Sequence, residues 1–280
     1  MKDLTKLGFK DNSTYIIAEI GINHGGDITV AKQLIDSAVR TGANAVKFQT
    51  YLTEKRVAAN SPIFDILKKC ELPFSAFEEL KAYAEAKNVD FFSTPFDSES
   101  VEFLDSINCN IYKIASFDLP NHEFLAQVAS KNKQVILSVG MSNLDEIRKA
   151  VDILKQGTNK IILLHCISAY PTNEKDSNLR AVHTLIEKFP ECAIGQSDHT
   201  NDIDVPSFAV AAGAQVLEKH FKIDEDMDCI DAPVSITEKQ MTQLVNNARR
   251  IEKILGHGVP KLTDSQKDIE QYRRHSELDK

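Results

Sequence analysis

The segment AIGQSDHTNDIDVPSFAVAAGAQVLEKHFKIDEDMDCIDAPVS, residues 193–235, decides the fold class of this chain. Its apolar runs predict a strand over Ala193–Asp198 and another over Val216–Phe221, joined by a short helix over about Ile203–Gly213. Parallel strands joined by a right-handed helical crossover lie side by side, with their carboxyl ends at the same rim. The segment therefore predicts one strand–helix–strand unit of a parallel α/β fold.

Two histidines stand at the carboxyl ends of these strands, His199 after the first and His220 in the second. We expect their imidazoles to lie close in space, with Glu218 on the same strand face as His220 and Asp231 in the loop beyond. Imidazoles and carboxylates are ligands that borderline divalent metals take. The segment therefore predicts a divalent-metal site, the alternative being that each histidine is a structural residue held by hydrogen bonds.

The same alternation of strand and helix extends through the rest of the chain. Six further strands are predicted at Tyr15–Gly21, Ala45–Tyr51, Phe91–Phe96, Ile111–Ser116, Gln134–Gly140 and Lys160–Cys166. Helices are predicted from Asp27 to Gly42 and over Met241–Leu255. A third begins at Leu144, where Asn143 and Glu146 form a capping signal. Eight strand-then-helix units in a chain of this length favour fold class α/β, as a closed (β/α)8 TIM barrel.

The barrel domain is expected to span residues 14–256, after an N-terminal leader at 1–13 and before a polar tail or linker at 257–280. A long insertion, Leu52–Pro73, separates the second and third predicted strands. Long loops in compact folds are commonly lids or binding elements. We therefore expect the insertion to serve the functional site.

Composition excludes several classes of partner. The 280 residues carry a formal net charge of -8 and are 42% hydrophobic and 26% charged, as in an ordinary globular protein, and they contain no basic block for nucleic acid or an anionic membrane. The five cysteines form no C-x-x-C pair, so neither a disulfide framework nor a zinc knuckle is predicted. The chain starts without the apolar core of a signal peptide and has no run of membrane-spanning length. We therefore expect a cytoplasmic protein.

The carboxyl ends of the predicted strands, where barrels place their active sites, are polar and include two lysines. Lysine in an apolar strand is costly unless its charge has a partner. Lys47 and Lys113 could form internal ion pairs with Glu19 or Asp118. Alternatively, they could face a phosphate or carboxylate of a ligand, with Ser and Thr hydroxyls as further donors. Their position at the strand ends favours ligand binding.

Eight motifs occur in an order and spacing that resemble the sialic acid synthase family: IIAEIGINHGG, AVKFQTY, FFSTPF, YKIAS, ILSVGMS, LLHCISAYP, IGQSDHT and LEKHF. The resemblance covers about Tyr15–Pro233. It implies that phosphoenolpyruvate condenses with an N-acetylated amino-sugar aldehyde, similar to N-acetylmannosamine, to give a nonulosonic (sialic-type) acid and phosphate. It also implies a homodimer and dependence on a divalent metal, Mn2+ or Mg2+.

The resemblance further implies roles for individual residues. The implied catalytic residues are Glu19, Lys47, Lys113, His199 and His220, of which the two histidines hold the metal. The implied phosphoenolpyruvate contacts are Lys47, Thr94, Lys113, Ser116, Ser138, Ser168 and Ser197. The implied sugar contacts are Gln49, Asn60, Tyr170 and Asp231.

Three features depart from the family pattern. In place of Ser-Gly-Glu after the fourth strand the chain has Ser116, Phe117 and Asp118, and the aromatic ring is expected to narrow the pocket. Ser168 stands where an asparagine is common. Family members usually carry an antifreeze-like domain after the barrel, and this chain ends soon after Arg274. That domain could have been removed, could be a separate chain, or could be missing from a barrel-only branch. The bare barrel is expected to bind phosphoenolpyruvate and metal, with weak or altered affinity for the sugar.

Two other functions stay open. One is another phosphoenolpyruvate-dependent 3-deoxy sugar-acid synthase that acts on a phosphorylated aldose, although the strand ends carry few of the extra Arg and Lys that a second phosphate requires. The other is a non-catalytic barrel subunit that retains ligand binding. The presence of Glu19 together with both lysines and both histidines argues against it.

Overall fold

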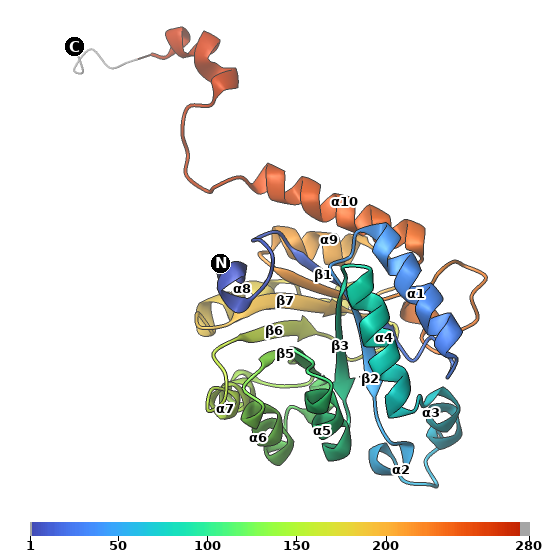
Figure 1. Ribbon diagram of the computed structural model, residues 1–280. Coiled ribbons are helices and arrows are strands. Elements are labelled where there is room, and N and C mark those ends of the chain that lie inside the picture. The colour runs from blue at the N-terminus through green and yellow to red at the C-terminus, as the bar shows by residue number, and fades with distance from the viewer. Residues whose placement is uncertain (1, 275–280) are drawn as a thin grey trace.

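The computed structural model describes residues 2–274 and contains a closed barrel of parallel strands, in the order β1 to β8, with β8 paired to β1 (Figure 1). The strands are β1 (Tyr15–Gly21), β2 (Ala45–Thr50), β3 (Asp90–Pro95), β4 (Ile111–Ile114), β5 (Gln134–Ser138), β6 (Ile161–Cys166), β7 (Ala193–Asp198) and β8 (Val216–His220). The predicted (β/α)8 barrel is confirmed, with strand ends that differ from the predicted ones by at most two residues.

Helices cover the outside of the barrel (Figure 1). They are α1 (Ile28–Thr41), α2 (Thr53–Arg56), α3 (Phe64–Cys70), α4 (Phe74–Ala86), α5 (Ser98–Ser106), α6 (His122–Ser130), α7 (Leu144–Leu154), α8 (Arg180–Lys188), α9 (Asp204–Ala211) and α10 (Glu238–Leu255). The capping box predicted for α7 is present, because the Asn143 side chain accepts a hydrogen bond from the Glu146 backbone and the Glu146 side chain accepts one from the Asn143 backbone.

The period of two along each strand creates two layers inside the barrel. In the lower layer, toward the amino ends of the strands, Ile17, Phe92 and Ile136 belong to one fully buried apolar cluster. The next inward positions toward the carboxyl ends are polar, since Glu19 follows Ile17 and Ser138 follows Ile136. A second, larger apolar cluster includes residues of both the strands and the surrounding helices. The barrel is therefore apolar at its amino end and polar at its carboxyl end.

The first residues of the chain close the amino end of the barrel. A 3-10 helix, Leu4–Leu7, and the nearby Phe9 belong to the same buried cluster as the inward-facing strand residues. The Lys2 backbone N–H donates to Gln215 Oε1 at 2.9 Å, and Gln215 Nε2 donates to the Lys2 carbonyl at 2.7 Å. The segment predicted as a leader at 1–13 therefore contains the floor of the barrel.

The insertion between β2 and β3 contains α2, of 4 residues, and α3, of 7 residues, so half of Leu52–Pro73 is helical. Two partly buried hydrogen bonds fix its start, from Leu52 N to Asp97 Oδ2 at 2.8 Å and from Thr53 N to Glu71 Oε2 at 2.8 Å. Asp97 follows β3, whereas Glu71 stands near the end of the insertion itself, so the start of the insertion is bound both to the segment after β3 and to the insertion's own end.

The residues after α10 extend away from the barrel (Figure 1). Every residue from Gly256 to Arg274 is exposed, including a 3-10 helix over Asp264–Tyr272. Residues 275–280 of the predicted tail lie outside the described residues. Among residues 2–274, no helix combines the length and the apolar character needed to cross a membrane.

Candidate active site

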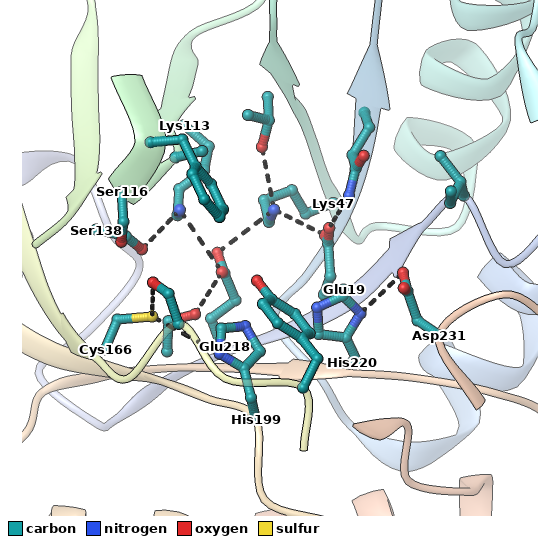
Figure 2. Close-up of a pocket in the computed structure, with 18 of the residues that line it drawn as sticks. Glu19, Lys47, Lys113, Ser116, Ser138, Cys166, His199, Glu218, His220 and Asp231 are labelled. Carbon is teal, nitrogen blue, oxygen red and sulfur yellow. Dashed lines mark hydrogen bonds and ion pairs between the residues drawn. The ribbon is translucent and has the colours of Figure 1, made fainter. Parts of the chain in front are cut away.

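A cavity of about 430 Å3 opens at the carboxyl ends of the barrel strands. Figure 2 shows side chains from several strands pointing into it. The predicted site residues that line it are Glu19, Lys47, Gln49, Thr94, Lys113, Ser116, Ser138, Ser168, Tyr170, Ser197, His199, His220 and Asp231. Asn60 is exposed on the insertion and does not line the cavity. The structure thus brings together every predicted residue but one, and their individual roles stay predictions.

Both cavity lysines are buried and have carboxylate partners (Figure 2). Lys47 Nζ lies 2.9 Å from Glu19 Oε2 and 3.7 Å from Glu218 Oε2. Lys113 Nζ lies 3.6 Å from Glu218 Oε1. The internal ion pair considered for Lys47 is therefore formed with Glu19, whereas the carboxylate beside Lys113 is Glu218 and not Asp118. Glu218 is shared by the two ammonium groups.

Hydroxyl groups surround the same ammonium groups. Lys47 Nζ donates to Thr94 Oγ1 at 3.1 Å, and Lys113 Nζ donates to Ser138 Oγ at 2.8 Å. Ser197 Oγ donates to the shared carboxylate at 2.9 Å. Two ammonium groups and several hydroxyls at one end of a cavity form a donor-rich region suited to an anion with many oxygens.

A glycine lets two more hydroxyls enter this region. The Gly140 backbone N–H donates to Ser116 Oγ at 3.0 Å. A Cβ atom at this position would lie 2.6 Å from Ser168 Oγ and 2.9 Å from Ser116 Oγ, closer than side-chain contacts allow. Gly140 is therefore required for the convergence of these two hydroxyls.

The two buried carboxylates have opposite pKa shifts. Burial raises the pKa of Glu19, and the nearby Glu218 adds to the rise, although Lys47 opposes it. Burial also disfavours the charged form of Glu218, but Lys113 and Lys47 hold the pKa of that carboxyl well below its usual range. Pairs of acids whose pKa values are moved apart in this way can divide the roles of proton carrier and fixed charge. The shifts favour the protonated form of Glu19 and the ionised form of Glu218.

The imidazoles of His199 and His220 lie side by side at the cavity, with ring centroids 5.4 Å apart (Figure 2). His199 Nδ1 lies 2.8 Å from the Ile167 carbonyl oxygen, so Nδ1 carries the hydrogen and Nε2 keeps its lone pair. Burial, and then the neighbouring His220, lower the pKa of His199 to about 3 and keep the ring neutral. His220 Nδ1 lies 3.3 Å from Asp231 Oδ2, and this carboxylate outweighs burial and raises the pKa of His220.

This donor set fits a divalent metal. Metal-binding histidines commonly use the ring nitrogen that does not bind the metal to donate a hydrogen bond to a carbonyl or carboxylate. His199 Nδ1 has such a partner in the Ile167 carbonyl, and His220 Nδ1 has one in the Asp231 carboxylate. In the part of the chain that the structure describes, no group of three or more His, Cys, Asp or Glu side chains is arranged to hold a metal. The protein therefore offers the imidazoles alone, and the other coordination positions would be left to water and substrate oxygens.

Several cavity residues were missed by sequence reasoning. Arg56 lines the cavity from the end of α2, and Cys166 lies with its Sγ 3.7 Å from His199 Nδ1. Arg56 belongs to no recognisable pattern but lies in the insertion that was expected to serve the site, and Cys166 stands in the LLHCISAYP motif without an assigned role. Glu218 was predicted beside His220, but its position between the lysines was not. Phe117 lines the cavity with 65% of its surface exposed, and its expected narrowing of the pocket stays a prediction.

The cavity occupies the place where (β/α)8 barrels carry out their chemistry, and the molecule is a barrel enzyme. Residues 34–260 match the model of the NeuB family. The chain belongs to that family, and several of its relatives are named as synthases.

Named relatives span most of the chain. An N,N'-diacetyllegionaminic acid synthase of Campylobacter jejuni is 38% identical, over 93% of this chain and 83% of its own length. An uncharacterized protein of Methanocaldococcus jannaschii is 44% identical, over 93% of this chain and 77% of its own length. The crystal structure of an N-acetylneuraminic acid synthetase from Leptospira borgpetersenii, in complex with citrate, is similar with a TM-score of 0.90 and 42% identity, covering 94% of this chain and 92% of the other.

Proposed function

We propose that this enzyme condenses phosphoenolpyruvate with an N-acetylated amino-sugar aldehyde to give a nonulosonic acid and phosphate. The main support for the proposal is that one cavity has two chemically different ends. Lys47 and Lys113 form a cationic end lined by hydroxyls, and His199, His220 and Asp231 form the other. The names of relatives support this reaction class, since they include N,N'-diacetyllegionaminic acid, pseudaminic acid and N-acetylneuraminate-9-phosphate synthases.

The cationic end suits phosphoenolpyruvate, which carries a phosphate and a carboxylate. Lys47 and Lys113 would each give up part of their contact with Glu218 and donate to these anions, with Thr94 and Ser138 already within hydrogen-bond distance of the ammonium groups. Charge-assisted hydrogen bonds of this kind are roughly twice as strong as neutral ones. Because Glu218 is ionised between the lysines, it keeps both of them protonated before the substrate arrives.

A divalent metal, Mn2+ or Mg2+, held by His199 and His220 would supply Lewis-acid polarisation of the acceptor's aldehyde group. The protein's own residues orient the imidazoles for this purpose through the Ile167 carbonyl and Asp231. Gln49 and Tyr170, which line the same cavity, would contact the sugar.

The reaction then needs proton transfer, which we assign to Glu19. Carbon 3 of the enol attacks the aldehyde carbon, and the new alkoxide takes up a proton. Water adds at carbon 2 and loses a proton, and the tetrahedral intermediate releases phosphate. Glu19 lies between Lys47 and Gln49, at 2.9 Å and 3.5 Å, and its raised pKa suits a group that accepts the proton of water and returns it to the alkoxide.

Phosphate release tests the proposal. The enzyme is mixed with phosphoenolpyruvate and Mn2+, and a panel of N-acetylhexosamines is compared with phosphorylated aldoses. Turnover with the first group supports the proposal, whereas turnover only with the second identifies a 3-deoxy sugar-acid synthase. Binding of phosphoenolpyruvate by calorimetry without any turnover would indicate a non-catalytic subunit. The acceptor, the homodimer, the separate antifreeze-like domain and the cytoplasmic location stay predictions.

A further inference from the structure

Arg56 is a cation at the cavity that the mechanism above does not use. It is the last residue of α2 and lines the cavity. Its guanidinium carbon lies 3.7 Å from the centroid of the Phe96 ring and 4.6 Å from that of Tyr51. The guanidinium therefore lies against two aromatic rings beside the cavity.

The guanidinium has more donors than partners. Its NH1 group donates to Gln49 Oε1 at 3.0 Å, and within residues 2–274 Arg56 forms no ion pair with a carboxylate. Burial lowers the pKa of Arg56, as expected for a charge removed from water, although arginine stays protonated. A guanidinium has five N–H donors, so the cavity contains donors that no protein group satisfies.

Several observations place these donors at the end of the cavity where the acceptor sugar would bind. Arg56 is hydrogen-bonded to Gln49, and a Cβ atom on Gly21 would lie 3.3 Å from Gln49 Nε2 and 3.4 Å from Asp231 Oδ2, so these two side chains flank the same point. The charge of Asp231 and that of Asp118 also act on Arg56. These carboxylates would repel a second phosphate at this end of the cavity. An uncharged oxygen is the better partner.

An apolar surface lies beside the guanidinium. Ile22 lines the cavity and packs in one buried cluster with Tyr51, against which Phe96 also packs. A carbonyl oxygen next to a methyl group matches hydrogen-bond donors next to an apolar surface. We propose that Arg56 binds the amide carbonyl of the acceptor's N-acetyl group and so helps to determine specificity for N-acetylated sugars. This inference rests on the proposed function.

The structure holds Arg56 in place without a ligand. The start of α2 is fixed by Leu52 N donating to Asp97 Oδ2 and by Thr53 N donating to Glu71 Oε2, both at 2.8 Å. Lys55 adds an ion pair to Glu99 at 3.1 Å. A residue positioned in advance loses little freedom on binding, so its hydrogen bonds contribute more of their energy to affinity.

Steady-state kinetics of Arg56→Gln and Arg56→Lys test the inference. Hydrogen bonds to a charged group imply that Arg56→Gln raises KM for N-acetylmannosamine by about 10–100-fold, while KM for phosphoenolpyruvate changes by less than about 2-fold. Arg56→Lys keeps the positive charge but loses the planar pair of N–H donors. Its KM for N-acetylmannosamine should therefore lie between those of the wild type and Arg56→Gln. Arg148→Ala is the matched control, because Arg148 also lies over an aromatic ring, Phe189 at 4.2 Å, but does not line the cavity.

A second substrate identifies the group that is bound. With mannose, which lacks the N-acetyl group, the ratio of kcat/KM between the wild type and Arg56→Gln should shrink toward 1. An equal ratio for both sugars would overturn the assignment to the amide carbonyl, and an unchanged KM for the N-acetylated sugar in both variants would overturn the role of Arg56. Absence of turnover in the wild type would instead overturn the proposed function, and this inference with it. Melting curves of both variants show whether they are folded.

Discussion

Replacing Glu218 with glutamine removes the one carboxylate that both cavity lysines share. Lys47 retains Glu19 at 2.9 Å, but Lys113 loses the only carboxylate with which it pairs in the described part of the chain. At 3.6 Å and an effective dielectric constant of about 20, that pair is worth about 4–5 kcal/mol before desolvation. Breaking a buried pair by removing one partner costs about 3–5 kcal/mol. For a chain of this length, we expect the melting temperature of Glu218→Gln to be about 5–10 °C below that of the wild type.

The assay is thermal unfolding at pH 7 with and without phosphoenolpyruvate. The ligand's anions replace the lost carboxylate, so the ligand should raise the melting temperature of Glu218→Gln more than that of the wild type. Glu238→Gln is the matched control, because Glu238 pairs with Arg40 at 2.6 Å on the surface, where such pairs contribute about 1 kcal/mol or less. A Glu218→Gln protein that melts within about 2 °C of the wild type would refute the reasoning about the shared carboxylate.

Three further outcomes follow from single residues. His199→Ala should abolish metal-dependent phosphate release, and unimpaired turnover would remove the metal role. Gly140→Ala places a Cβ atom 2.6 Å from Ser168 Oγ and 2.9 Å from Ser116 Oγ, so calorimetry should show phosphoenolpyruvate binding at least about 10-fold weaker. Burial raises the pKa of Asp118 from 3.8 to about 6, so the fold loses stability as pH rises from 3.8 to about 6, and this loss is complete above pH 6 and absent below pH 3.8. Asp118→Asn should therefore stabilise the protein at pH 8 by about 1–2 kcal/mol and leave unfolding at pH 3.5 unchanged.

The barrel and the centre of its cavity could be predicted because both depend on local regularities. Each strand is a short apolar run, and alternation with helices fixes a parallel order. Since parallel strands share one rim, the approach of His199 and His220 followed from chain order alone. The lysines were predicted for a similar reason, because a charge inside an apolar strand, as at Lys47 and Lys113, must meet a partner.

The missed features depend on contacts between distant segments. Arg56 lies in α2, whose start is bound to Glu71 within the insertion and to Asp97 outside it, and the pairing of Leu52 with Asp97 across 45 positions is not indicated by any pattern in the insertion. Leu4 and Phe9 stand among polar residues without a helical or strand period, so no sequence pattern indicates that they are buried under the barrel. Glu218 lies between Lys47 and Lys113 because of side-chain geometry across three strands. The residue pattern within any one strand does not predict that geometry.

The floor of the barrel is synthesised well before the last strands that it contacts. Lys2 and Gln215 are 213 positions apart, and β1 pairs with β8 along its length. At roughly 5–20 residues per second, a ribosome needs about 10–40 s to supply the second partner of these contacts. Until then the side chains of Leu4, Leu7 and Phe9 have no completed barrel to enter. Closure of the ring is thus an event that follows translation of the eighth strand.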